Sequence, residues 1–235
     1  MRWRGQSVCI IASGPSLTRE DAAYARRHAD RVITVNESWR MCPDADAVYG
    51  ADTLWWQHRA PPLDEFKGER WTQQSQWKTP FPPGVQCFQS KPGTAIAPPG
   101  SGFVYTGHNS SFQALGLAVA WGAEYVVFLG LDLSALPDGT NHWHGDHVQP
   151  LVNSLTAYPT FIKAFTKAAP VLAELGVYVV NASRRTALEA FPRMTPEEAF
   201  AEIRRRKRGI PVRTADPARQ AEVDYFFDPD GDGDL

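Results

Sequence analysis

The sequence predicts an α/β protein: a Rossmann-like domain whose mostly parallel sheet carries helices on both faces. Near-continuous apolar runs, typical of strands buried on both sides, recur along the chain. They alternate with longer segments of helical pattern, as expected for a layered α/β domain. We expect residues 1–210 to form this single domain, with a loop-rich insertion at about 54–105 and a partly disordered tail over 211–235.

The predicted strands share short apolar runs followed by a polar or glycine residue. They span residues 8–12, 32–35, 47–50, 85–88, 125–129 and 177–180. The predicted helices lie between them. The first begins at residues 18–21, which resemble a capping box. The others cover residues 54–58, 110–121, 155–175 and 195–208. Pro159 and Pro170 are expected to interrupt the fourth of these helices, because proline breaks a helix interior.

Composition narrows the class of protein. The chain has 235 residues, 43% apolar residues and a net charge of −2, which fits one soluble core without a general attraction to nucleic acid or anionic membrane. No stretch approaches the roughly 20 apolar residues that span a bilayer. Three cysteines without a CxxC pair are typical of a reducing compartment, so we expect a cytoplasmic protein.

A tight turn follows the first predicted strand and leads into the first helix. It consists of Ser13, Gly14, Pro15 and Ser16. Backbone N–H groups at a helix N-terminus bind anions, and a glycine lets a phosphate approach the backbone closely. The alternative interpretation is an ordinary turn between a strand and a helix.

Further polar residues end other predicted strands: Asn36, Asp52, Asp132 and Asn181. The C-terminal ends of parallel strands share one edge of the sheet, where open α/β sheets bind ligands. Each residue alone is also a common turn former. Together they suit a nucleotide, with amides for base and ribose and a carboxylate for a hydroxyl.

A histidine-rich loop lies between the strongest predicted strand and the next helix. His142, His144, Asp146 and His147 fall within six residues and should overhang the same edge. Imidazole titrates near neutral pH and can act as a general base. The same four side chains would suit a zinc or other divalent metal site, which is the second interpretation.

In order along the chain, several short motifs resemble the sialyltransferases of glycosyltransferase family 42 and the related 6-hydroxymethylpterin pyrophosphokinase-like proteins (domain of unknown function 115), including phage-encoded ones. The matching segments are residues 13–17, 35–36, 106–111, 129–133, 142–147 and 181–183. The resemblance covers roughly residues 8–192. It implies a Rossmann-like domain that binds an activated nucleotide sugar and needs no metal.

Site residues follow from the resemblance at the matching positions. Donor contacts are implied for Gly14, Pro15, Ser16, Asn36, Ser110, Ser111, Gly130 and Asp132, and the strand-end pattern adds Ser13, Asp52 and Asn181. The resemblance implies His147, or else His142, as the base, and His144 is a third candidate. Ser110-Ser111 replaces the Thr-Ser-Gly of the family, which leaves the sugar open. The denser histidine loop leaves the base and a divalent metal open.

The sequence therefore predicts a glycosyltransferase that uses a nucleotide-sugar donor and a histidine base. The expected acceptor is a glycan or modified phage DNA, and a homo-oligomer is compatible with the pattern. If the acceptor is DNA, the basic run 204–208 would contact its backbone; otherwise the run is a solvated helix end. The alternatives are an ATP-dependent pyrophosphokinase with Asp52, Asp132 and Asp146 at its phosphates, and a non-catalytic nucleotide-binding protein. A GxxxxGK[ST] loop is absent.

Overall fold

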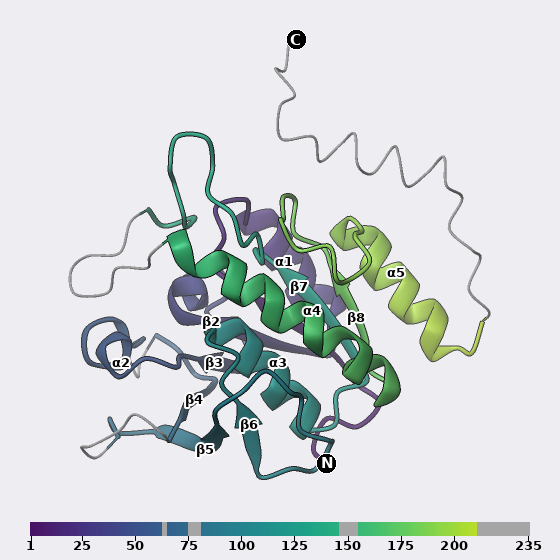
Figure 1. Ribbon diagram of the computed structural model, residues 1–235, viewed down its shortest axis with the longest axis horizontal. Coiled ribbons are helices and arrows are strands. Elements are labelled where there is room, and N and C mark those ends of the chain that lie inside the picture. Colours follow the sequence, from purple (N-terminus) through teal and green to yellow (C-terminus); the bar gives the residue numbers. More distant parts are fainter. Residues whose placement is uncertain (63–64, 75–80, 146–154, 211–235) are drawn as a thin grey trace.

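The computed structural model describes residues 1–62, 65–74, 81–145 and 155–210. Within them, eight strands form one parallel sheet in the order β6-β5-β4-β3-β2-β1-β7-β8 (Figure 1). The strands are β1 (Ser7–Ile11), β2 (Arg31–Val35), β3 (Ala47–Tyr49), β4 (Glu69–Gln73), β5 (Val85–Lys91), β6 (Phe103–Tyr105), β7 (Tyr125–Leu129) and β8 (Tyr178–Asn181). The helices are α1 (Arg19–His28), η1 (Asn36–Arg40), α2 (Thr53–Arg59), α3 (Ser110–Ala120), η2 (Leu155–Ala157), α4 (Tyr158–Glu174) and α5 (Pro196–Lys207). The predicted α/β class is confirmed.

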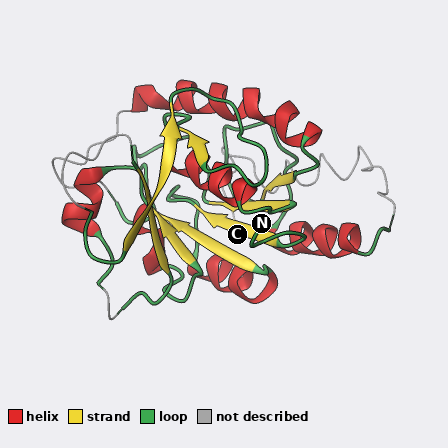
Figure 2. Ribbon diagram, turned by 90° about the horizontal axis from the view of Figure 1, so that it is seen from below, coloured by secondary structure: helices red, strands yellow, loops and turns green. Residues whose placement is uncertain are grey.

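Successive residues of β1 enter two separate hydrophobic cores. Val8 and Ile10 pack into the core that also contains residues of α3 and α4, whereas Cys9 and Ile11 pack into the core that contains residues of α1 and α5. Side chains of a strand point alternately to the two faces of a sheet, so helices on both faces bury the whole strand. Figure 2 shows this arrangement, with helices on both sides of the twisted sheet.

The path of the chain creates a switch point beside β1. From β1 the chain builds the sheet outward to β6, then returns through α3 to place β7 on the other side of β1. The connection after β1 continues into α1 on one face, and the connection after β7 continues towards α4 on the other. Loops that diverge to opposite faces leave a crevice at the C-terminal ends of the strands.

The stretch predicted as a loop-rich insertion, residues 54–105, contributes three strands to the same sheet. The sequence predicted only β5 there. It missed β4, which holds buried polar residues, and the short β6. In β4 one guanidinium nitrogen of Arg70 donates to the carbonyl oxygens of Pro62 and Phe66 at 3.0 and 2.8 Å. The charged residue is thereby accommodated in a buried strand, although its Nε has no partner among the described residues.

Helix α4 is continuous, so the predicted interruptions at Pro159 and Pro170 are wrong. Pro159 lies in the first turn, where no intrahelical partner is lost. Pro170 lies inside the helix, but Ala168 and Leu172 on either side of it are buried in one core. We attribute the continuity to this packing, which outweighs the local cost of proline.

Side chains cap both α1 and α5 at their N-termini, and half of the capping box predicted at residues 18–21 is present. Thr195 and Glu198 form a complete capping box at α5. Thr18 accepts from the Asp21 N–H at 3.1 Å at the start of α1. The Asp21 carboxylate does not complete that box. It forms an ion pair with Arg184 at 2.7 Å instead, which ties α1 to the loop after β8.

Three residues of the basic run at residues 204–208 form ion pairs with other residues of the chain. Arg205 and Arg206 pair with Glu202 at 2.7 and 2.6 Å, and Lys207 pairs with Asp30. These contacts favour the solvated helix end over a nucleic-acid contact. No helix among the described residues is both long enough and apolar enough to cross a membrane.

Candidate functional site

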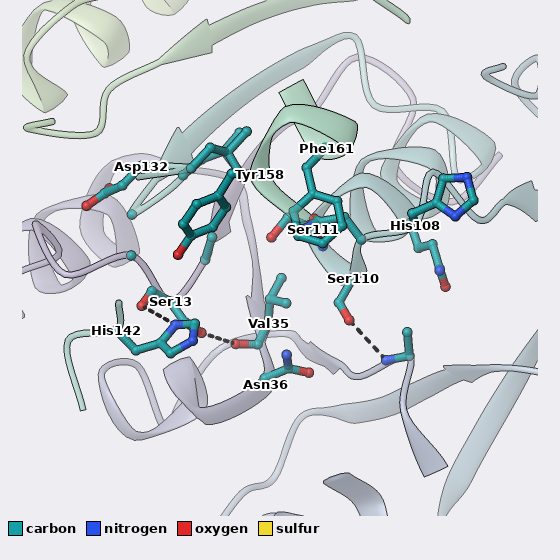
Figure 3. Close-up of a pocket in the computed structure, with 18 of the residues that line it drawn as sticks. Ser13, Val35, Asn36, His108, Ser110, Ser111, Asp132, His142, Tyr158 and Phe161 are labelled. Atoms are coloured by element: carbon teal, nitrogen blue, oxygen red, sulfur yellow. Dashed lines mark hydrogen bonds between the residues drawn. The ribbon is translucent and has the colours of Figure 1, made fainter. Parts of the chain in front are cut away.

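A cavity of about 410 Å³ opens at the switch point, a volume typical of small-molecule sites (Figure 3). Its walls come from the C-terminal ends of β1, β2, β3, β4 and β7, from the N-terminus of α3 and from the first turn of α4. The lining residues are Ala12, Ser13, Gly14, Val35, Asn36, Ala51, Asp52, Gln73, Thr106, His108, Asn109, Ser110, Ser111, Gln113, Gly130, Leu131, Asp132, Leu133, Ser134, Asn141, His142, Tyr158 and Phe161.

The structure brings together most residues that the sequence singled out. Those that line the cavity are Ser13, Gly14, Asn36, Asp52, Ser110, Ser111, Gly130, Asp132 and His142. They come from segments up to 129 residues apart, as between Ser13 and His142. Most of the predicted strand-end residues therefore lie together at one edge of the sheet, as expected.

Asn181 does not line this cavity. It is fully buried, and its amide nitrogen donates to the Thr186 hydroxyl at 3.0 Å and to the Leu131 carbonyl at 3.4 Å. Its amide oxygen accepts from the Ser183 N–H at 3.1 Å. Partners in the loops after β7 and β8 thus engage the amide, and the structure does not place Asn181 with the predicted donor-binding residues that line the cavity.

The turn after β1 does not present the open phosphate cradle that the sequence suggested. The carboxylate of Asp132 accepts from the Ser16 N–H at 2.7 Å and from the Ser16 hydroxyl at 2.8 Å. The Gly14 N–H donates to the Gly130 carbonyl at 2.7 Å. Pro15 and Ser16 are not among the lining residues. The protein's own carboxylate therefore occupies the place proposed for an anion.

Burial dominates the electrostatics of Asp132. The side chain is 1% exposed, and removal from water raises its pKa to about 6, although the two bonds from Ser16 and the charge of Arg185 lower the pKa in part. Gly14 fits against this carboxylate, because a Cβ at that position would lie 2.4 Å from the Asp132 Cγ. The glycine is required by packing within the protein.

At the N-terminus of α3 the helix cap takes two backbone N–H groups, and the Ser111 hydroxyl remains as a donor beside the positive end of the helix dipole. Asn109 caps the helix by accepting from the N–H groups of Ser111 and Phe112 at 2.8 and 3.1 Å. Ser110 accepts from the Ala51 N–H at 3.4 Å. The Ser111 side chain is 6% exposed, lines the cavity and bonds to no other described residue. A helix N-terminus with a hydroxyl beside it favours a negatively charged group.

Of the predicted catalytic histidines, His142 is the one that the structure places in the cavity wall. Its Nδ1 lies 3.3 Å from the Ser13 carbonyl oxygen. His144 stacks on His142 with ring centroids 5.1 Å apart but does not line the cavity. His147, the favoured base, and Asp146 lie outside the described residues. Within those residues, no group of three or more His, Cys, Asp or Glu side chains is arranged to hold a metal ion.

Among the described residues, three non-glycine residues have a left-handed backbone, and all three line the cavity. They are Asn36, His108 and Leu133, with φ of 50°, 59° and 50°. This conformation is uncommon for residues other than glycine, although Asn, Asp and His adopt it more readily than most, and backbone strain gathers at functional sites. His108 and Leu133 were not among the predicted site residues.

Several oxygen atoms in the wall are buried without a partner among the described residues. They are the side-chain oxygens of Asn36, Asn141 and Ser134. Buried polar atoms are nearly always paired in native proteins, so these atoms are available to donors of a ligand. Amines and hydroxyls of a base or sugar carry such donors.

Two aromatic residues that sequence reasoning missed complete the site. Tyr158 and Phe161 lie in the first turn of α4, and Figure 3 shows Tyr158 and Phe161 facing the cavity beside Ser111. Burial and the nearby Asp132 charge raise the pKa of Tyr158. The sequence before α4 contains no motif from which the position of these two residues relative to the cavity could be predicted.

Comparison of the chain with protein-family models gives no match, and comparison with curated proteins gives none either.

Proposed function

We propose that the chain is a glycosyltransferase that moves a sugar from a nucleotide-sugar donor to an acceptor hydroxyl, with His142 as general base. One observation carries the proposal. The cavity combines an imidazole held at Nδ1 by a backbone carbonyl with a helix N-terminus and an unpartnered serine hydroxyl. A base and an anion-stabilising end in one cavity suit a displacement that releases a phosphate.

The proposed reaction is a single displacement at the anomeric carbon of the sugar. The acceptor oxygen forms a bond to the anomeric carbon as the bond from that carbon to the donor phosphate breaks. The acceptor proton passes to His142, and the N-terminus of α3 with Ser110 and Ser111 receives the negative charge of the leaving phosphate. The unpartnered oxygens of Asn36 and Asn141 accept hydrogen bonds from the base or the sugar.

A second candidate is a magnesium- and ATP-dependent phosphotransferase, favoured by the Asp52 carboxylate in the cavity wall. The Asp52 backbone carbonyl accepts from the Trp56 N–H at 3.3 Å, but its carboxylate makes no capping bond to α2. Asp132, the other carboxylate of the wall, is bonded to Ser16, and Asp146 lies outside the described residues. This arrangement supports the phosphotransferase less well than the glycosyltransferase.

The first experiment is a thermal-shift screen with sugar nucleotides of one and two phosphates, and with ATP plus magnesium. A ligand at 100 times its Kd stabilises the native state by about 2.7 kcal/mol, which is readily measured. Turnover is then followed by nucleotide release with candidate glycan and DNA acceptors. Stabilisation by ATP with magnesium alone would favour the phosphotransferase and contradict the proposal.

The second experiment replaces the base. His142→Gln should lower turnover by about 10²–10⁴-fold and leave donor affinity nearly unchanged, because the general base acts in the transition state. His28→Gln is the matched control, since His28 packs against Tyr24 at the end of α1 and does not line the cavity. Full activity in His142→Gln would refute the assignment of His142.

A further inference from the structure

The histidine loop is held onto the sheet by Trp143, a residue to which the proposed reaction gives no role. The Trp143 N–H donates to the Ser13 carbonyl at 3.2 Å, and its indole Nε1–H donates to the Ser38 hydroxyl at 3.2 Å. The ring packs against the core beneath α1 and α5. The backbone and the side chain of this one residue therefore fix the loop to the end of β1 and to η1, which directly follows β2.

The Ser38 hydroxyl beneath Trp143 has a defined role as donor on one side and acceptor on the other. The Ser38 hydroxyl is fully buried and donates its proton to the Ala12 carbonyl at 2.7 Å. Its oxygen is then left to accept, and the indole N–H is placed to donate to it. Ser13 adds a second connection, because its hydroxyl lies 3.1 Å from the Ser38 hydroxyl and 3.2 Å from the Val35 carbonyl.

The Ser13 carbonyl also sets the protonation of His142. A carbonyl oxygen can only accept, so the His142 Nδ1 at 3.3 Å from it carries the proton. In the neutral ring the lone pair is then on Nε2, the atom that a general base would use. Trp143 and His142 are adjacent in the chain and donate to the same oxygen, as Figure 3 shows for the His142 bond to Ser13.

Ring contacts supply a second connection. Trp143 meets His144 edge-on, with ring centroids 5.2 Å apart at 90°, and His144 stacks on His142 with an interplanar angle of 4°. The Arg40 guanidinium lies 5.7 Å from the centroid of the Trp143 ring. The orientation of the indole is thereby passed to the His142 ring.

We propose that Trp143 is a positioning residue that holds His142 in its Nδ1–H tautomer with Nε2 as the basic atom. The catalytic meaning of this role rests on the proposed function, whereas the tautomer itself does not. Aligned catalytic groups gain much of their effect from fixed geometry, and a displacement of about 1 Å can lower a rate 10²-fold.

The test reads the tautomer directly in the full chain. Two-bond ¹H–¹⁵N correlation spectra of ¹⁵N-histidine protein, recorded at about pH 8 where a typical imidazole is neutral, distinguish protonated from unprotonated ring nitrogens. His142→Gln identifies the His142 signals among the six histidines. Wild-type protein without substrate should show His142 as Nδ1–H. A wild-type Nε2–H pattern would overturn the proposal.

Trp143→Phe keeps an aromatic ring but removes the indole donor. The Nδ1–H pattern of His142 should give way to a mixture of tautomers, and turnover should fall roughly 10- to 100-fold with the donor KM unchanged. Trp121→Phe is the matched control, because Trp121 packs against Trp3 and does not line the cavity. A wild-type His142 spectrum in folded Trp143→Phe would overturn the proposal.

Ser38→Ala provides an independent route to the same result. It removes the acceptor of the indole N–H and leaves Trp143 in place. We expect the same change in the His142 spectrum, with folding checked by circular dichroism, and an unchanged spectrum would overturn the proposal. Because the spectra are recorded without donor or acceptor, failure of the glycosyltransferase assignment would leave this result standing.

Discussion

The Asp132 carboxylate receives both the backbone N–H and the hydroxyl of Ser16, a residue 116 positions earlier in the chain. The pair joins the turn after β1 to the turn after β7. The Asp132 carbonyl also accepts from the Ala187 N–H at 2.7 Å, which brings in the loop after β8. One residue therefore holds three loops in place on one side of the cavity.

Asp132 should make stability fall as pH rises. Its native pKa of about 6 lies above the value near 3.9 of an unfolded aspartate, so the native state binds the proton more tightly. The stabilising contribution is complete below about pH 4 and is lost as pH rises through about 6, an effect on the order of 2–3 kcal/mol. The free energy of unfolding, measured with urea across this pH range, should decline less steeply in Asp132→Asn than in the wild type. The exposed Glu174→Gln control should keep the wild-type slope, and identical slopes in all three proteins would contradict the shift.

Gly14→Ala should destabilise the fold. The added Cβ would meet the Asp132 Cγ at 2.4 Å and the Gly130 carbonyl oxygen at 2.6 Å, and the backbone oxygen cannot easily move. Overpacking of this kind costs about 1–3 kcal/mol, measurable as a lower midpoint of urea unfolding. Gly102→Ala is the control, since nothing lies within 4 Å of its added Cβ. Equal midpoints for the two variants would show that the turn relaxes freely.

Ser111→Ala should weaken binding of the nucleotide-sugar donor. A hydrogen bond to a charged group contributes about 1.5–3 kcal/mol, which corresponds to roughly a 10- to 150-fold rise in Kd. Isothermal titration calorimetry with the donor found by the screen gives the value directly. Ser101→Ala, just before β6 and away from the cavity, should bind as wild type does. Wild-type affinity in Ser111→Ala would place the phosphate elsewhere.

Chelation should leave donor binding and turnover unchanged if His142 works as a base. The metal alternative predicts the opposite, because metal binding requires all of its ligands together. Turnover measured in excess EDTA, and again with added zinc or manganese, separates the two. Loss of activity on chelation, matched by similar losses in His144→Ala, Asp146→Ala and His147→Ala, would establish a metal-dependent enzyme.

The sequence predicted those parts of the fold in which one local signal dominates. β1 and β7 are apolar runs buried in the centre of the sheet, and periodicity identifies them. β4 escaped prediction because its buried Arg70 is paired only with carbonyl oxygens that the tertiary fold supplies. The continuity of α4 through Pro170 likewise depends on packing that no local pattern reveals.

The sequence predicted which residues lie at the cavity better than it predicted what each residue does there. Asn36, Asp52 and Ser111 follow the general rule for strand ends and helix starts, and they line the cavity. The bond between Ser16 and Asp132 and the saturation of Asn181 depend on contacts between distant segments, which residue type alone does not encode. Tyr158 and Phe161 reach the cavity only because α4 crosses that edge of the sheet.

The left-handed residues at the cavity carry a consequence for laboratory evolution. Glycine would relieve the backbone at His108 and Leu133, because left-handed residues cost about 1–2 kcal/mol for ordinary side chains. A selection for thermostability alone would therefore enrich changes at the cavity and remove side chains that line it. Activity and heat resistance should trade against each other at these positions first, and a stabilised variant intended to remain active should keep both residues as they are.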